Sequence, residues 1–194
     1  MVQTPVRSMT LAEFLATPET KPASEYIDGQ IIQKPMPQGQ HSIIQRQLLF
    51  AINLVLSNVG IAQAFPELRC NFSGRSIVPD VAVFESHRIP EKDQGDVANV
   101  FEAAPNWVIG ILSPGQSTTK VLRNIKHCVD HGTQMGWLID PEDRSVIVIG
   151  VGQIFDAIDE PNAILPVPKF ARSIQLTTAE IFGWLQKKRK TTSA

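Results

Sequence analysis

The chain has 194 residues, of which 43% are hydrophobic and 19% charged, and its 18 basic and 19 acidic residues give a net charge of −1. This composition excludes a disordered chain and a strongly basic nucleic-acid-binding protein, although a local basic patch remains compatible with it. With no break in composition, we expect a single domain over residues 1–194, with a short N-terminal helix. The basic run Lys187–Lys190 is expected to form a frayed C-terminal tail.

Membrane and export signals are absent from the sequence. No apolar run approaches the roughly 18 residues that a membrane-spanning helix needs. The first ten residues lack the apolar centre of a signal peptide. Cys70 and Cys128 offer neither a disulfide framework nor a metal-ligand spacing. We therefore expect the protein in a reducing cytoplasm, with no membrane partner.

The N-terminal half predicts a hairpin followed by a long helix. Thr10 and Glu13 have the spacing of a capping box, which favours a short helix. Asp28-Gly29 is a dipeptide typical of two-residue hairpin turns. Apolar residues recur at spacings of three and four over 41–58, which indicates a helix. Strands are expected over residues 61–65, 69–72 and 77–84.

The C-terminal half predicts a helix that crosses between two buried strands. The apolar run 107–112 suits a strand buried on both faces. A helix over 117–131 and a second strand over 136–139 follow it. Such a crossover favours a mixed β-sheet flanked by helices, in the α+β or α/β class. A closing hairpin, 146–149 with 153–155, and a last helix after Thr177 complete the expected elements.

Asp80 is the most informative polar residue. An aspartate in an apolar run such as Val78–Val83 is energetically costly unless a partner satisfies its charge. Side chains alternate along a strand, so Asp80, Ala82 and Phe84 would share one face. By local pattern alone, an Asp that follows Pro79 also fits an ordinary turn residue.

Several motifs, taken together, are more informative than any single residue. In chain order, over roughly residues 10–150, the motifs are Ser24–Gly29, His41, Val78–Val81, Ala104–Pro114, Lys126 and Gly136–Pro141. This ordered set resembles the Uma2 (DUF820) family of proposed restriction endonucleases. The resemblance implies a restriction-endonuclease-like core of the PD-(D/E)xK nuclease superfamily.

The family resemblance also implies a DNA endonuclease that depends on Mg²⁺ or Mn²⁺. Asp80 matches the family's metal-binding aspartate, and Glu25 matches an acid on its N-terminal segment. Lys126 matches a lysine that lies on a helix in this family. Hard cations prefer oxygen ligands, and a bound metal polarises the phosphate that is attacked. A lysine nearby would stabilise the negative charge that develops.

Gly110 departs from the family pattern, which has a glutamate at this position. The loss removes one of two anionic metal ligands, so metal affinity should fall. The enzyme is then inactive and retains only binding, or another group such as Glu25, Glu67 or Gln116 replaces the ligand, or residue 110 has been altered in this chain. His41, at the start of the long helix, would bond a backbone group or bind phosphate.

The sequence leaves three functions open. The first is a metal-dependent DNA endonuclease, impaired at Gly110. The alternative is a catalytically inactive nucleic-acid-binding or protein-interaction module on the same fold. The third is a structural or regulatory homodimer with no nucleic-acid role. Superfamily members often dimerise to cut both strands, and the hairpin near 146–155 could pair with a second copy.

Overall fold

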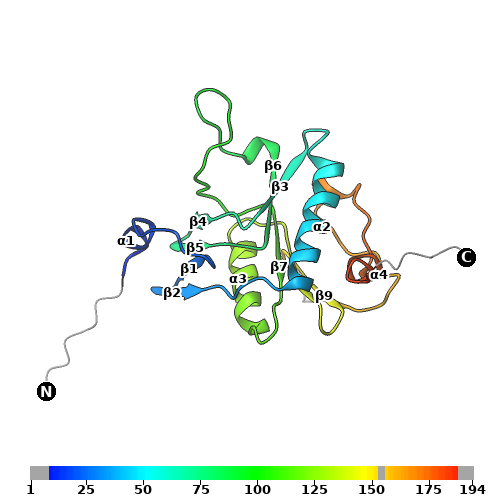
Figure 1. Cartoon of the computed structure of the whole chain (residues 1–194). Coiled ribbons are helices and arrows are strands. Elements are labelled where there is room, and N and C mark those ends of the chain that lie inside the picture. Colours follow the sequence, from blue (N-terminus) through cyan, green and yellow to red (C-terminus); the bar gives the residue numbers. More distant parts are fainter. Residues whose placement is uncertain (1–8, 153–155, 188–194) are drawn as a thin grey trace, which may run out of the picture.

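The structure is a computed structural model that describes residues 9–152 and 156–187 (Figure 1). Its helices are α1 (Leu11–Leu15), α2 (Gly39–Leu56), α3 (Thr118–Asp130) and α4 (Thr178–Gly183), with 3₁₀ turns at Ser86–Arg88 and Lys169–Ala171. Its strands are β1 (Ser24–Ile27), β2 (Gln30–Gln33), β3 (Ala62–Pro66), β4 (Cys70–Phe72), β5 (Arg75–Ile77), β6 (Val81–Glu85), β7 (Trp107–Ile111), β8 (Met135–Asp140), β9 (Ser145–Gly150) and β10 (Asp156–Ile158). The expected strand 153–155 and most of the basic tail, 188–190, lie outside the described residues.

The larger sheet has six strands in the order β10-β9-β8-β7-β6-β3. β7 and β8 are parallel, with Ile109 opposite Trp137, and α3 makes the crossover between them. The other neighbouring pairs in this sheet are antiparallel. The predicted mixed sheet with a helical crossover is thus confirmed.

Helices cover both faces of this sheet, with α2 and α3 on opposite sides of β7 (Figure 1). Trp107, Ile109 and Ile111 of β7 belong to the core that contains α2 and α4. Val108 and Leu112 belong to the second core, which contains α3. Strand alternation therefore directs the even-numbered residues of β7, Gly110 among them, toward α3.

The smaller sheet has the order β2-β1-β5-β4. Asp28 and Gly29 join β1 to β2 with φ values of 50° and 82°, the paired positive values of a type I′ hairpin turn. The sequence did not predict this second sheet as a separate layer, because each of its strands is only three or four residues long.

The strand predicted over 77–84 is wrong as a single element, because it is interrupted next to Asp80. β5 ends at Ile77 in the smaller sheet, and β6 begins at Val81 in the larger one. Pro79 has no N–H for a sheet ladder, and the Val78 N–H donates to the Glu25 carboxylate at 2.8 Å. Residues 78–80 therefore link the two sheets, and Asp80 lies at their junction.

Local helix signals are formed as expected. Thr10 and Glu13 make both hydrogen bonds of a capping box at α1, and Thr177 and Glu180 do the same at α4. Each box satisfies backbone N–H groups that the first helical turn leaves without partners. Among the described residues, no helix combines the length and apolar character that a membrane span requires.

Candidate active site

A cavity of about 50 Å³ lies where the two sheets meet α3. β1 supplies Glu25, the link between the sheets supplies Asp80, β7 supplies Gly110 and α3 supplies Asn124. We call this space, with these four lining residues, the acid cavity. The fold thus brings two of the three predicted catalytic residues together, beside the glycine that replaces the expected glutamate.

Asp80 is 6% exposed, and its carboxylate has three partners. Its Oδ1 atom accepts a hydrogen bond from the Lys34 ammonium at 2.7 Å and lies 3.2 Å from His41 Nε2. Its Oδ2 atom accepts one from the Ile111 N–H at 2.7 Å. Burial acts to raise the pKa of Asp80, but Lys34 and His41 outweigh it, so the pKa lies below its usual value. Asp80 is therefore an anion at neutral pH.

Glu25 is 8% exposed and has a different environment. Its Oε1 atom accepts from the Val78 N–H at 2.8 Å, and its Oε2 atom accepts from the Asn124 amide at 3.3 Å. Burial raises the pKa of Glu25, the charge of Asp80 adds to this, and the Val78 bond and Lys34 oppose it only in part. The two carboxyl groups have pKa values displaced in opposite directions, as in many acid–base pairs.

Lys34 is the cation beside these acids, and sequence reasoning missed it. Its ammonium donates to both Asp80 Oδ1 and the Val78 carbonyl at 2.7 Å, and its side chain is 15% exposed. Nothing in the segment around Lys34 points to a partner 46 residues away. Asn124, also missed, had a signal: it is a polar residue between Val121 and Ile125 on the apolar side of a predicted helix.

Lys126, the predicted catalytic lysine, is not brought to the acid cavity. Its ammonium bonds the two oxygens of Asp130 at 2.8 and 2.6 Å, and its side chain is 58% exposed. Val121, Asn124 and Ile125 of α3 line the cavity, and Lys126 does not. Glu67 is exposed in the turn after β3 and contacts Asp80 only through its backbone N–H, which donates to the Asp80 carbonyl at 3.3 Å.

His41 lies in the first turn of α2 and is 5% exposed. Its Nε2 atom is directed at Asp80, so the side chain bonds a carboxylate and not a backbone group, which was one of our two expectations. Its Nδ1 atom has no hydrogen-bond partner within residues 9–152 and 156–187. His41 thus acts with Lys34 to lower the pKa of Asp80.

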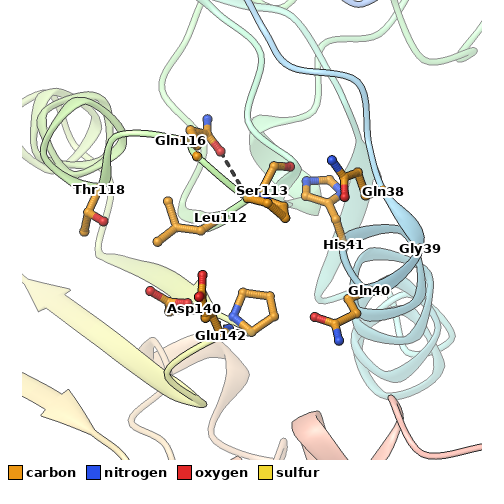
Figure 2. A pocket seen from close by; sticks show the side chains of 13 residues that line it. Gln38, Gly39, Gln40, His41, Leu112, Ser113, Gln116, Thr118, Asp140 and Glu142 are labelled. Carbon is orange, nitrogen blue, oxygen red and sulfur yellow. Dashed lines mark hydrogen bonds between the residues drawn. The ribbon is translucent and has the colours of Figure 1, made fainter.

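Two larger depressions adjoin the acid cavity, and Gln116 lines all three. The first, about 500 Å³, lies between the start of α2 and the loops after β7 and β8, and we call it the α2 groove. Figure 2 shows Gln38 and His41 on one side of it, Gln116 on the other, and Asp140 and Glu142 below. The second, about 550 Å³, lies between the β1–β2 hairpin and α3, and we call it the hairpin groove.

A divalent cation does not fit the acid cavity as it stands. Lys34, His41 and the Ile111 N–H already engage both oxygens of Asp80, and Gly110 offers no side-chain ligand atom. Among the described residues, no group of three or more His, Cys, Asp or Glu side chains could hold a metal ion. Mg²⁺ and Mn²⁺ sites are built from several oxygen ligands, so the residues present disagree with the metal centre implied by the family resemblance.

Comparisons with known proteins agree on the fold. The family model "Uma2: Putative restriction endonuclease" matches residues 11–179. A crystal structure of a putative nuclease belonging to DUF820 from Anabaena variabilis is 54% identical and superposes with a TM-score of 0.91. That match covers 92% of this chain and 99% of the Anabaena chain. No curated protein matches this sequence.

Proposed function

The chain belongs to the Uma2 family, and from this premise we propose that it is a nucleic-acid-binding protein whose phosphodiester hydrolysis is impaired. One observation carries the impairment: the Lys34 ammonium bonds Asp80 beside Gly110, where the family pattern has a second acid. The expected nucleic acid is DNA, and Mg²⁺ or Mn²⁺ is the metal that we expect the site to hold only when an acid stands at position 110.

The charge balance of the acid cavity supports this proposal. A metal-dependent active centre needs carboxylates whose negative charge is not neutralised by other groups, because that charge binds the metal ion. Here Lys34 offsets the charge of Asp80, and burial favours the protonated form of Glu25. Loss of a glutamate at position 110 also avoids a buried carboxylate without a cation, which would destabilise the fold. The cavity is consistent with a fold that is stable without metal.

A second candidate function is an active endonuclease in which Glu25 replaces the missing ligand. Glu25 lines the same cavity as Asp80, and the charge of Asp80 contributes to its raised pKa. A cation bound between them would have to displace Lys34 from Asp80 and the Asn124 amide from Glu25. This candidate therefore predicts weak metal binding that strengthens when Lys34 is replaced.

The test restores the acid at position 110. A Cβ atom on Gly110 would lie 2.9 Å from Cγ1 of Val121, so Gly110→Glu needs room that the wild type lacks. We would therefore compare the wild type with Gly110→Glu/Val121→Ala, and use Val121→Ala as the matched control. Mn²⁺ binding is measured by calorimetry, DNA binding by fluorescence anisotropy, and cleavage on supercoiled and linear DNA.

We expect the wild type to bind DNA in a salt-sensitive way without cutting it, and the double variant to bind Mn²⁺ at least tenfold more tightly and to nick supercoiled DNA. The Val121→Ala control should behave as the wild type. Equal cleavage by wild type and double variant, abolished by Glu25→Gln, would favour the second candidate. Absence of DNA binding by every variant would overturn the nucleic-acid proposal.

The homodimer stays a prediction. β10 is the terminal strand of the larger sheet and pairs with β9 along one edge. A second copy would have to pair with the opposite edge of β10. Part of the hairpin on which the prediction was made, 153–155, lies outside the described residues. Sedimentation at increasing concentration measures the mass directly, and a monomer at the highest concentration would remove the prediction.

A further inference from the structure

We infer that the hairpin groove binds the phosphate backbone of DNA, with Lys120 and Arg123 of α3 as its principal contacts. This inference rests on the proposed function and assigns it to one surface. The groove runs between the β1–β2 hairpin and the first half of α3, and Gln116 is shared between it and the acid cavity. A strand lying in the groove would therefore pass the entrance of that cavity.

The charges of the groove favour an anion. Its lining has the cationic side chains Lys34, Arg75, Lys120 and Arg123, and the carboxylates Glu25 and Asp28. Arg75 is paired with Asp28 at 2.6 Å, and Lys34 with Asp80 at 2.7 Å. Within the described part of the chain, Lys120 and Arg123 make no ion pair. Both are exposed, so both can meet a phosphate without first breaking an internal contact.

The direction of α3 adds to this positive potential. α3 has 13 residues, its N-cap Ser117 makes no side-chain capping bond, and its first turn contains no acid. Ser117 and Lys120 both line the groove, so the N-terminal end of the helix opens onto it. The partial positive charge of a helix N-terminus favours anions, and here it reinforces two side-chain cations.

The α2 groove differs in charge, which makes the assignment specific. Its lining includes Asp140 and Glu142, and neither Lys nor Arg is among its residues in the described part of the chain (Figure 2). Carboxylates repel phosphate, so DNA should avoid this side of Gln116. Because the net charge of the whole chain is only −1, a local excess of cations in one groove is the feature that would attract DNA.

The chemistry of the lining indicates how the strand would be held. No Phe, Tyr or Trp lines the hairpin groove among the described residues, so it lacks the stacking surface that single-strand-binding proteins use. The amides of Gln30, Gln33 and Gln116 can donate to phosphate oxygens beside the cations. We therefore expect contacts to the backbone, with duplex bound at least as tightly as single strand.

The test compares two double substitutions with the same change in charge. Lys120→Ala/Arg123→Ala removes the groove cations, and Lys169→Ala/Arg172→Ala removes two exposed cations near the turn Lys169–Ala171, which line neither groove. Binding of a labelled duplex and of its single strand is measured by anisotropy over a series of salt concentrations. Thermal unfolding checks that both variants are folded.

We expect the groove variant to bind duplex at least tenfold more weakly. The negative slope of log affinity against log salt should decrease in magnitude by about 0.9 for each lost phosphate contact. The control should stay within twofold of the wild type. Equal weakening by both variants would overturn the assignment of DNA binding to the hairpin groove, but not the proposal that the protein binds DNA. Failure of the wild type to bind any DNA would instead overturn the proposed function. A tenfold higher affinity for single-stranded DNA than for duplex would overturn the proposal that the groove contacts mainly the phosphate backbone.

Discussion

The Lys34 ammonium lies 2.7 Å from the Oδ1 atom of Asp80, and the two side chains are only 15% and 8% exposed. This ion pair joins the end of the β1–β2 hairpin to the junction of the two sheets. A buried carboxylate needs such partners, because removal of one partner leaves an uncompensated charge in a medium of low polarity. Lys34 therefore stabilises the fold at the aspartate that the family resemblance predicted as a metal ligand.

Lys34→Ala should lower the free energy of unfolding by about 3 kcal/mol, the lower end of the range for breaking a buried pair, since His41 and the Ile111 N–H remain as partners. Urea denaturation at neutral pH measures the change. Lys126→Ala serves as the control, because its pair with Asp130 is 58% and 51% exposed and should contribute less than about 1 kcal/mol. Equal effects of the two substitutions would contradict the buried pair.

Glu25→Gln should gain stability relative to the wild type as the pH rises. The pKa of Glu25 is raised in the folded state above 4.5, chiefly by burial. Between the unfolded-state pKa of 4.5 and the higher folded-state pKa, the folded state binds more protons than the unfolded state. The wild type therefore loses stability as the pH increases through this window. Gln cannot titrate. Urea denaturation from acid to neutral pH should show the difference growing with pH, and a constant difference would count against the raised pKa.

Asp80→Asn should show the opposite dependence. The folded-state pKa of Asp80 lies below 3.8, because Lys34 and His41 outweigh its burial. Its stabilising contribution is therefore present above pH 3.8 and is lost as the pH falls through the folded-state value. The variant should be less stable than the wild type at neutral pH, and the gap should narrow in acid. A stability difference between variant and wild type that widens in acid would contradict the lowered pKa of Asp80.

Gly136→Ala should destabilise the fold more than Gly110→Ala. A Cβ atom on Gly136 would lie 2.1 Å from Cγ2 of Ile125, whereas one on Gly110 would lie 2.9 Å from Cγ1 of Val121. Overpacking typically costs about 1–3 kcal/mol, and we expect Gly136→Ala at the top of that range and Gly110→Ala at its lower end. Thermal unfolding of both variants provides the comparison. The reverse order would argue against close packing of α3 on β8.

The two core tryptophans should differ in their response to phenylalanine. Their rings are 4.7 Å apart and nearly perpendicular, and both are fully buried. Trp137 Nε1 donates to the Pro166 carbonyl at 2.9 Å, while Trp107 Nε1 has no partner among the described residues. Trp137→Phe should therefore cost about 1 kcal/mol more than Trp107→Phe, the net contribution of one hydrogen bond. Urea denaturation measures both, and equal losses would contradict this assignment.

Sequence alone was sufficient for the elements whose signals lie within a few residues. The Asp28-Gly29 turn, the periodicity of α2 and the capping boxes of α1 and α4 are local, because each depends on spacings of one to four positions. The mixed sheet followed from a helix placed between two buried strands. Glu25 and Asp80 came from family resemblance, since neither had a local pattern that separates a functional acid from a turn residue.

Only the tertiary structure decided what surrounds those acids. Lys34 meets Asp80 across 46 residues, and Asn124 meets Glu25 across 99, because the interruption at Val78–Asp80 brings two sheets and α3 to one point. Lys126, by contrast, pairs with Asp130 four residues along the same helix, a contact that the spacing alone allows. Long polar side chains reach partners set by the meeting of distant elements, and that geometry is not encoded in any short spacing along the chain.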